Sequence, residues 1–323
     1  MLGAQAPIIR TFYRTPLVVL VLLVANCEGN AEQLPLRVYT TADGLPHNVV
    51  NKIIRDSRGF LWFCTNDGMS RFDGYEFVNF GVKQGLPHSV VNDLLETREG
   101  EYWIATNGAL VKFDPNGFPD KQAAPTNQSK SSSASPIFVV LTPTTDDPNS
   151  RVVNSLTHLH DGSILCGTGA GVFRVVKTKT QFALEPVDIS EPGKPSEQKI
   201  VNSLLEDRFG TLWAGRTSGL YRRWPDGKSV RYGKADGLPE GIIHDLLEDH
   251  NGDIWLANRA NGFFQLANAE RDAPIIKRAF NNKSGLPSNW VFDLLCDVLN
   301  ANCERGCQYI ESKLNDQFVF PNQ

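Results

Sequence analysis

The chain has 323 residues, of which 41% are hydrophobic and 21% are charged, and its formal net charge is −4 at pH 7. This modest charge argues against nucleic acid and anionic membrane surfaces as partners, because both attract proteins with a large excess of Lys and Arg. After the N-terminal segment, no apolar stretch approaches the roughly 20 residues that a membrane-spanning helix needs. We therefore expect any contact with a membrane to be made through the N-terminus alone.

The N-terminal segment has the architecture of a signal peptide. Arg10 and Arg14 precede an apolar run over 17–25, and small and polar residues follow as far as Ala31. We predict a signal peptide over 1–31, with cleavage after Ala31. The alternative is an uncleaved N-terminal anchor, and in both cases the rest of the chain is expected to be exported.

A short motif recurs along the rest of the chain. Its copies are VVNKIIRD from Val49, VVNDLLET from Val90, VVNSLTHL from Val152, VNSLLEDR from Val201, IHDLLEDH from Ile243 and VFDLLCDV from Val291. We call the position of the asparagine in VVN the anchor position. It is occupied by Asn51, Asn92, Asn154, Asn202 and His244. Recurrence of this kind indicates a fold built from structural repeats.

Fixed landmarks accompany five of the copies. A glycine follows the anchor position at Gly59, Gly100, Gly162, Gly210 and Gly252. Beyond that glycine stand Trp62, Trp103, Leu165, Trp213 and Trp255, and then a second glycine at Gly68, Gly108, Gly171, Gly219 and Gly262. The tripeptide GLP begins at Gly44, Gly85, Gly237 and Gly285. The coincidence of these landmarks shows that the units are related.

Each unit reads as a small antiparallel sheet. The motif is apolar on both faces, which predicts a strand that is covered on both sides. A tight polar turn then leads to an aromatic-rich strand such as 60–65, and this is a hairpin signal. Two further short strands complete a unit of about 40 to 50 residues, which is typical of a β-propeller blade. The tryptophans are then expected to fill the space between blades.

The predicted fold class is therefore all-β, a β-propeller of four-stranded blades with five recognisable blades and a degenerate or truncated sixth. The repeats occupy 32–297, in units of approximately 36–80, 81–142, 143–189, 190–232, 233–280 and a partial 281–297. A Ser-, Pro- and Gln-rich stretch over 115–136 is predicted to be a flexible insertion between the second and third blades.

The sixth unit loses its landmarks, because Asn300 stands in the glycine place and Cys303 in the tryptophan place. Two interpretations of the aberrant tail over 298–323 remain open. It is an atypical closing blade, or a truncation or frameshift has replaced the true continuation, and we favour the second because capping repeats usually keep their turns. The segment 36–40 is a candidate for the outer strand of the last blade.

The cysteines do not indicate a metal centre. Cys64 and Cys166 stand at positions that hold small or apolar residues in the other units, so we expect both to be core residues. Cys296, Cys303 and Cys307 lie close together at the end of the chain but lack the regular paired spacing of a zinc site. We predict no metal and no cofactor.

Acidic residues at Asp56, Asp161, Asp207 and Asp249 would suit a glycosidase, in which two carboxyl groups perform the acid–base chemistry. However, we interpret them as one recurring position of the repeat. A residue present in every blade is more economically explained as part of that blade's own hairpin turn. We therefore predict a structural role for these four carboxylates.

Residues that depart from the repeat are the better functional candidates. Arg216 and Asn258 replace a threonine of the other units, His244 replaces the anchor asparagine, and Arg259 follows Asn258. We predict that these four residues contact a ligand. The threonines that they are compared with are Thr65, Thr106 and Thr168.

The remaining histidines carry less information. His158 and His160 are predicted to share one face of a strand, where a solvated strand end is favoured over a metal site. His47 and His88 follow the GLP turns and are interpreted as polar loop residues. No histidine stands in a phosphoacceptor context, and neither a phosphate-binding loop nor a G-x-S-x-G motif is present. We predict no enzymatic activity for this chain.

The stretch GLPHSVVNDLLETREGEYWIATNGALVKFD resembles the repeat of the two-component regulator propeller family. The resemblance extends over about 36–297. In that family, propellers are extracytoplasmic sensor regions of bacterial hybrid or classical histidine kinases. The resemblance thus implies a periplasmic or secreted bacterial module that binds a small-molecule or saccharide ligand and acts with a downstream sensor kinase or response regulator. Any kinase activity would reside in a part that this chain lacks.

Two alternatives belong to other functional classes. The first is a secreted propeller enzyme, a lyase or glycoside hydrolase that acts on polysaccharide, and it requires a cluster of non-repeating acidic or histidine residues. The second is a non-signalling scaffold that binds other proteins. Fold alone does not separate these functions, so the residues at the site must do so.

Overall fold

The computed structural model describes residues 36–115, 137–179, 181–189, 199–267, 275–286, 288–291, 293–296, 307–310 and 318–321. The predicted signal peptide, almost all of the predicted insertion and most of the tail lie outside these residues. Within them, the helices are short 3-10 turns, namely η1 (Thr41–Asp43), η2 (Val82–Gln84), η3 (Pro148–Arg151), η4 (Lys234–Asp236) and η5 (Asn282–Ser284). No helix in this part of the chain has the length and apolar character needed to cross a membrane.

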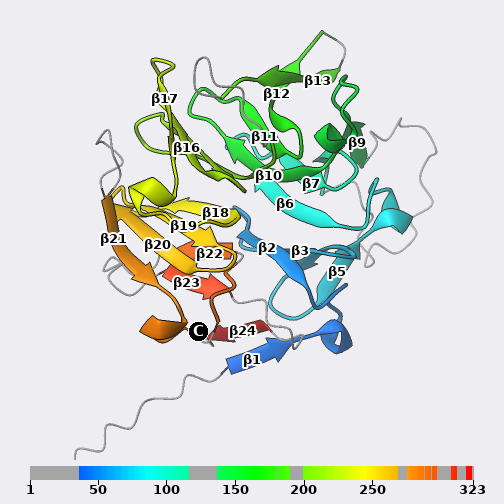
Figure 1. Cartoon of the computed structure of the whole chain (residues 1–323). Coiled ribbons are helices and arrows are strands. Elements are labelled where there is room, and N and C mark those ends of the chain that lie inside the picture. Colours follow the sequence, from blue (N-terminus) through cyan, green and yellow to red (C-terminus); the bar gives the residue numbers. More distant parts are fainter. Residues whose placement is uncertain are drawn as a thin grey trace, which may run out of the picture. The chain divides into compact units, whose positions relative to one another are not determined.

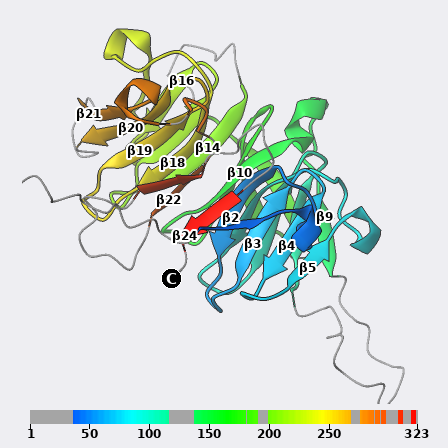
Figure 2. The same cartoon turned by 90° about the horizontal axis from the view of Figure 1, so that it is seen from below.

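Five four-stranded antiparallel sheets form the blades, and each follows the chain from its innermost to its outermost strand (Figure 1). The first two blades are β2 (Val50–Arg55), β3 (Leu61–Thr65), β4 (Gly68–Phe72) and β5 (Phe77–Phe80), then β6 (Val91–Glu96), β7 (Tyr102–Thr106), β8 (Leu110–Phe113) and β9 (Phe138–Leu141). Figure 2 shows the strands of the first blade side by side from β2 to β5.

The other three blades repeat this order. The third contains β10 (Val153–His158), β11 (Ile164–Thr168), β12 (Gly171–Lys177) and β13 (Phe182–Val187). The fourth contains β14 (Val201–Glu206), β15 (Leu212–Arg216), β16 (Gly219–Arg223) and β17 (Ser229–Tyr232). The fifth contains β18 (Ile243–Glu248), β19 (Ile254–Asn258), β20 (Gly262–Ala267) and β21 (Ile275–Phe280). The predicted all-β propeller with five recognisable blades is confirmed.

Two smaller sheets complete the described structure. The sixth unit contributes β22 (Asp293–Cys296) and β23 (Cys307–Ile310), whose register places Cys296 opposite Cys307. β1 (Leu36–Tyr39) pairs with β24 (Phe318–Pro321) in a sheet of its own. The blades belong to one compact unit, Val38–Val319, and the described residues 36–37 and 320–321 belong to another.

The innermost strands β2, β6, β10, β14, β18 and β22 contact one another in chain order, and β22 also contacts β2. The contact between the first and last of these strands includes a hydrogen bond from the Ile53 amide to the Asp293 carboxylate, at 3.4 Å. The six inner strands therefore form a closed circle. Labelled members of this circle, β2, β6, β10 and β18, surround the centre of the view in Figure 1.

Apolar side chains fill the interface between each pair of neighbouring blades. Trp62 is fully buried against Val91 and Leu94 of the second blade. The equivalent tryptophans and Leu165 make the same contact with the inner strand of the next blade, in clusters that contain Trp103, Leu165, Trp213 and Trp255. Burying an aromatic or aliphatic side chain of this size contributes about 1.5–3 kcal/mol. The predicted role of the tryptophans between blades is confirmed.

The two recurring glycines meet different steric requirements. Gly59 ends the first hairpin turn with a φ of 90°, a left-handed conformation that favours glycine. At Gly68, where φ is 96°, an added Cβ would lie 2.4 Å from the carbonyl oxygen of Phe80. In the first blade, the second glycine is thus required both by its φ and by the close approach of the outermost strand.

The hairpin aspartates have the structural role that we predicted. Asp56 Oδ1 accepts the amides of Arg58 and Phe60, at 3.0 and 2.9 Å, and Oδ2 accepts Trp62 Nε1 at 2.9 Å. Burial acts to raise the pKa of Asp56, but the hydrogen bonds from Trp62, Phe60 and Tyr102 hold it below its usual value. Asp207 and Asp249 bind Trp213 and Trp255 in the same way, each at 2.8 Å.

The assignment of Asp161 to this recurring hairpin position was wrong. Asp161 lies two residues beyond the equivalent position, which Leu159 occupies, and it accepts the amide and hydroxyl of Ser163 instead. In the second blade the position belongs to Thr97, which cannot offer a carboxylate. Within the described structure, the buried Nε1 of Trp103 consequently has no hydrogen-bond partner. A buried donor without a partner costs about 1–3 kcal/mol.

The substitution Thr97→Asp should therefore stabilise the protein. The new carboxylate would accept Trp103 Nε1, and we expect the free energy of unfolding to rise by about 1 kcal/mol. Urea denaturation followed by tryptophan fluorescence measures this change. The matched variant Asp207→Thr removes the acceptor of Trp213 and should lower the free energy of unfolding by about 1–3 kcal/mol. Equal stability of all three proteins would contradict this role for the carboxylate.

Candidate functional site

The residue after each anchor position lies at the centre of the ring, and we call this the axial position. A β-bulge in all five blades shifts the register at the anchor residue, as between Val50 and Lys52 in the first blade. The axial position differs in chemistry from unit to unit, unlike the apolar positions around it. Its occupants are Lys52, Asp93, Ser155, Ser203, Asp245 and Asp293.

Lys52 reaches from the first blade to two other inner strands. Its Nζ lies 2.9 Å from Asp245 Oδ1 on β18 and 2.7 Å from Asp293 Oδ1 on β22. The side chains of Lys52, Asp245 and Asp293 are 25%, 11% and 5% exposed. Burial acts to lower the pKa of Lys52, but the two carboxylates raise it well above its usual value. The ammonium group is therefore charged at any physiological pH.

The aspartates at axial positions also bind the backbone of the next inner strand. Asp93 Oδ2 accepts the Leu156 amide at 2.7 Å, and Asp245 Oδ2 accepts the Leu294 amide at 2.8 Å. Asp293 completes the pattern through its contact with the amide of Ile53 on β2. Each carboxylate thus joins its own blade to the following one.

Lys52, Asp93, Asp245 and Asp293, which we call the axial cluster, contain three carboxyl groups and one ammonium group. Burial raises the pKa of Asp93 to about 6 and that of Asp293 to about 7, although Lys52 opposes both shifts. Raised carboxyl pKa values occur in acid–base catalysts, but buried ion-pair networks also produce them. Here the carboxylates bind backbone amides and a lysine, which is a structural arrangement.

The predicted ligand residues lie at the end of the inner strands where the anchor positions are, which we call the anchor end. Arg216 is buried at the end of β15, and its guanidinium carbon lies 4.2 Å from the centre of the Tyr221 ring. Burial lowers the pKa of Arg216. The structure therefore places Arg216 in the packing of the fourth blade.

Asn258 replaces threonine in a turn. In the first blade, Thr65 Oγ1 donates to the Gly68 carbonyl at 2.8 Å and accepts the Asp67 amide at 3.1 Å. Asn258 is likewise buried, and its Oδ1 accepts the Ala260 amide at 3.1 Å and Asn261 Nδ2 at 2.9 Å. An amide therefore stabilises the turn that a hydroxyl stabilises in other blades.

His244 is partly buried, whereas Arg259 is exposed. Burial lowers the pKa of His244 to about 4, with a further contribution from Arg259, so its imidazole is neutral near pH 7. Arg259 is exposed, and its guanidinium carbon lies 5.3 Å from the centre of the Trp290 ring. Trp290 itself is 46% exposed. The structure thus brings His244, Arg259 and Trp290, which we call the anchor-end cluster, to one end of the ring.

Trp290 was missed from the sequence, although a signal for it exists. It directly precedes the motif of the sixth unit, where the other units carry a β-branched aliphatic residue. It is therefore an exception to the repeat in the same sense as His244. The residues at this position in the other units are Val49, Val90, Val152, Ile200 and Ile242.

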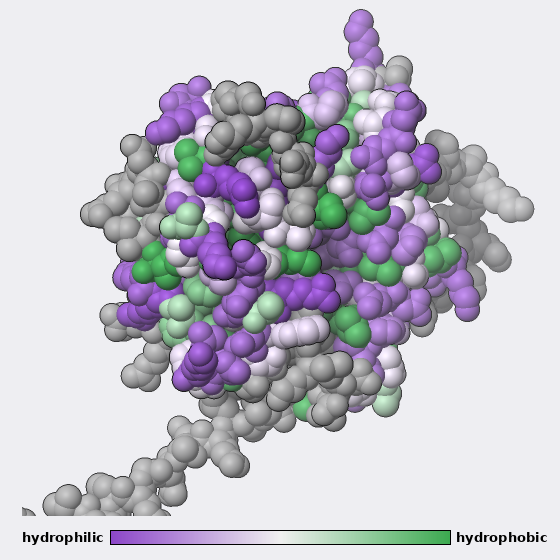
Figure 3. All heavy atoms as spheres, viewed as in Figure 1, coloured by the Kyte–Doolittle hydropathy of each residue, from purple (hydrophilic) through white to green (hydrophobic). Residues whose placement is uncertain are grey.

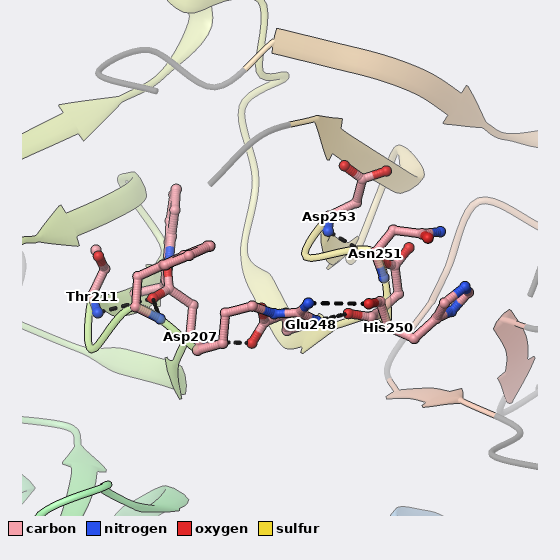
Figure 4. Close-up of polar contacts among 10 residues, drawn as sticks. Asp207, Thr211, Glu248, His250, Asn251 and Asp253 are labelled. Atoms are coloured by element: carbon pink, nitrogen blue, oxygen red, sulfur yellow. Dashed lines mark hydrogen bonds and ion pairs between the residues drawn. The ribbon is translucent and has the colours of Figure 1, made fainter. Parts of the chain in front are cut away.

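At the other end of the inner strands, recurring glutamates join one hairpin to the next blade. Glu248 accepts the Arg208 amide at 2.9 Å and pairs with its guanidinium group, which also donates to the carbonyl of His250 at 3.1 Å (Figure 4). Glu96 accepts the amide and hydroxyl of Ser57, both at 2.6 Å. These contacts repeat around the ring and are structural.

The histidines outside the anchor-end cluster also have structural partners. The expectation that His158 and His160 share a strand face was wrong, because β10 ends at His158 and His160 lies in the turn. His158 Nε2 lies 3.7 Å from Glu99, whereas His160 Nδ1 lies 3.0 Å from Glu206. Nδ1 of His47 accepts the Val49 amide at 2.9 Å, and His88 binds the Val90 amide in the same way.

Comparison with known proteins identifies the repeat. The family model described as "two component regulator propeller" matches residues 44–67, 85–108 and 237–260. No curated protein matches the chain.

Solved structures with the same fold include extracellular domains of two B. thetaiotaomicron proteins, titled a hybrid two-component system and a one-component system. The first has a TM-score of 0.63 and 18% identity, and the match covers 85% of this chain and 34% of that domain. The second has a TM-score of 0.60 and 19% identity, and the match covers 88% of this chain and 37% of that domain. This chain thus spans about a third of their length. Virginiamycin B lyase from Staphylococcus aureus has a TM-score of 0.56 at 13% identity, over 84% of this chain and 79% of its own. Likeness at these identities shows the fold alone.

The variant Lys52→Met tests the axial cluster, because it keeps the length of the side chain and removes its charge. Leaving buried carboxylates without their partner should lower the free energy of unfolding by about 3–5 kcal/mol near neutral pH. Lys234→Met is the control, since Lys234 forms an exposed pair with Glu240 and should change stability by less than about 0.5 kcal/mol. Equal effects in urea denaturation would show that the carboxylates do not hold the Lys52 ammonium group.

Proposed function

We propose that this chain, whose residues 44–67, 85–108 and 237–260 match the two-component regulator propeller model, is the extracytoplasmic sensory propeller of a two-component signal transduction system. It is exported to the periplasm or beyond, and it binds a small-molecule or saccharide ligand at the anchor end of the ring. A sensor kinase or a response regulator system is its downstream partner. The extracellular domains with similar folds support an extracytoplasmic location and a sensor-type role.

The observation that carries the proposed ligand site is the grouping of non-repeating residues. His244, Arg259 and Trp290 come from the fifth and sixth units. His244 and Trp290 depart from the residue type of the other units, and Arg259 is a charged residue at a position that is uncharged in the first four blades. Residues that maintain the blades recur, whereas residues that contact a ligand need appear only once. Departure from the repeat together with spatial grouping therefore supports a binding site.

The chemistry of the anchor-end cluster suits a saccharide. The half-exposed ring of Trp290 offers an apolar face on which a sugar ring can stack, and its edge is polar. Arg259 offers several N–H donors for hydroxyl or carboxylate oxygens. Because His244 is neutral near pH 7, it can both donate and accept a hydrogen bond. One apolar face with few directed polar groups is the usual composition of a small-molecule site.

An enzyme that acts on polysaccharide is the second candidate, and one observation favours it. Asp93 and Asp293 have raised pKa values and do not belong to the recurring hairpin set. Against this candidate, both carboxyl groups are buried and already engaged by backbone amides and Lys52. A protein-binding scaffold is supported less, because hydrophobic residues form separate small patches on the coloured part of the face in Figure 3.

Calorimetric titration with a panel of soluble neutral and uronic-acid oligosaccharides tests the proposed function. We expect saturable binding without turnover, and Arg259→Ala and Trp290→Ala should each weaken it at least about tenfold, or about 1.4 kcal/mol. The matched control is Thr217→Ala, which alters the position of the fourth blade that corresponds to Arg259. Its affinity should equal that of the unchanged protein.

Two results would contradict this proposal. Release of shortened or unsaturated oligosaccharides would show an enzyme instead of a sensor. Equal affinity of Arg259→Ala, Trp290→Ala and the unchanged protein would show that the ligand binds away from the anchor-end cluster.

Substituting His244 by Gln should leave the pH dependence of binding between about pH 5.5 and pH 8 unchanged, since the imidazole stays neutral over this range.

A further inference from the structure

The interface between the first and last inner strands differs from the interfaces between the first four blades. At three of the others, the anchor asparagine donates to a carbonyl of the next inner strand, with Asn51, Asn92 and Asn154 reaching Val91, Val153 and Val201 at 2.7–2.9 Å. The sixth unit carries Phe292 at this position, and its ring has no N–H or O–H donor. The closing interface therefore lacks the amide donor that joins the first four blades, and Asn202 Nδ2 of the fourth blade likewise has no hydrogen-bond partner within the described residues.

A second recurring contact is also replaced at the closing interface. The glutamates that receive the hairpin of the preceding blade, such as Glu96 and Glu248, correspond to Arg55 in the first unit, which follows the sixth unit around the ring. In contrast, the axial position of the sixth unit carries an acidic residue, Asp293. Asp293 joins β22 to β2 twice, through Lys52 Nζ at 2.7 Å and the Ile53 amide at 3.4 Å. Lys52 adds Asp245 of the fifth blade at 2.9 Å.

We propose that Lys52, Asp245 and Asp293 form a ring-closing triad, and that the ring loosens between β2 and β22 when the two carboxyl groups lose the proton they hold together. The geometry supports this assignment because the triad connects residues that are 241 positions apart in the chain. One ammonium group satisfies two ionised carboxylates only in part. A proton on the carboxyl pair relieves the repulsion between them.

The charges that face the triad favour this behaviour. Asp93 from β6 adds a third carboxyl group, and burial holds its pKa at about 6. Burial raises the pKa of Asp293 to about 7, and a hydrogen bond with Asp245 also contributes. The neighbouring His244 is neutral above about pH 5, and burial raises the pKa of the Cys64 thiol well above its usual value. Neither of these two groups titrates near neutral pH.

The direction of the effect follows from these pKa values. A carboxyl group whose pKa is higher in the folded protein than in the unfolded chain binds more protons when folded. Its contribution to stability is complete below the unfolded value of 3.8 and is lost as the pH rises through about 7 for Asp293. The closing interface is therefore stronger in mild acid than at alkaline pH.

Hydrogen–deuterium exchange of the full chain tests the proposal. Protection factors, which are corrected for intrinsic exchange rates, are compared at about pH 5.5 and about pH 8 in peptides that cover β2, β22 and β14. β14 serves as the reference because its axial residue is the uncharged Ser203. Protection of β2 and β22 should fall at least about tenfold as the pH rises, because a shift of one pKa unit corresponds to a factor of ten. Protection of β14 should stay nearly constant.

Variants separate the triad from other causes. Asp293→Asn and, independently, Asp245→Asn remove the shared proton and should abolish the pH dependence in β2 and β22. Asp93→Asn is the matched control, since it removes a carboxyl group with a raised pKa but leaves the triad intact, so the pH dependence should persist. The proposal is overturned if β22 follows β14 in the unchanged protein, or if either triad variant that folds keeps the pH dependence.

Discussion

The structure depends on how neighbouring inner strands are joined, because each blade is a complete sheet and shares no strand ladder with the next. Apolar packing supplies most of the attraction at these interfaces, through tryptophans such as Trp62 and Trp213. Apolar packing is not directional, so it does not by itself fix the register of one blade against another. Polar side chains that bind the backbone of a neighbouring blade fix this register. Asn51 and Asp93 bind the next inner strand, whereas Glu248 binds the hairpin of the preceding blade.

These polar contacts also explain which residues recur and which do not. An asparagine that reaches the next strand joins the first four blades, and an aspartate caps the hairpins of the first, fourth and fifth blades. At the centre of the ring, however, axial residues of different blades meet, as Lys52 meets Asp245 and Asp293. Six carboxylates there would repel one another, so the position must carry mixed chemistry, and Lys52 compensates Asp245 and Asp293. Variation at the axial position is thus a consequence of ring closure.

Departure from the repeat is therefore an ambiguous signal of function. Arg216 and Asn258 depart from it, yet Arg216 packs on Tyr221 and Asn258 stabilises a turn. Arg259 and Trp290 also depart from it and lie at an exposed position. Exposure together with spatial grouping, more than departure alone, separates candidate ligand contacts from structural replacements.

The sequence was sufficient to predict the blades, the packing of the tryptophans and the role of Asp56, because each follows from a local pattern repeated at a fixed spacing. It was not sufficient to predict the axial cluster, since Lys52 and Asp293 meet only after the six inner strands have closed the ring. The equivalence of Asn258 to a threonine was missed because it depends on a hydrogen bond and not on similarity of side chains. Trp290 was missed because the sixth unit lacks the landmarks that define the register of the others.

A double-mutant cycle between Lys52 and Asp293 tests the central claim most directly, since these residues meet only if the inner strands form a closed circle. The free energy of unfolding is measured at about pH 8 for the unchanged protein, Lys52→Met, Asp293→Asn and the double variant. A closed ring predicts a coupling energy of about 1–3 kcal/mol between the two positions. A coupling energy of zero, with each substitution acting independently, would contradict closure of the ring through these side chains.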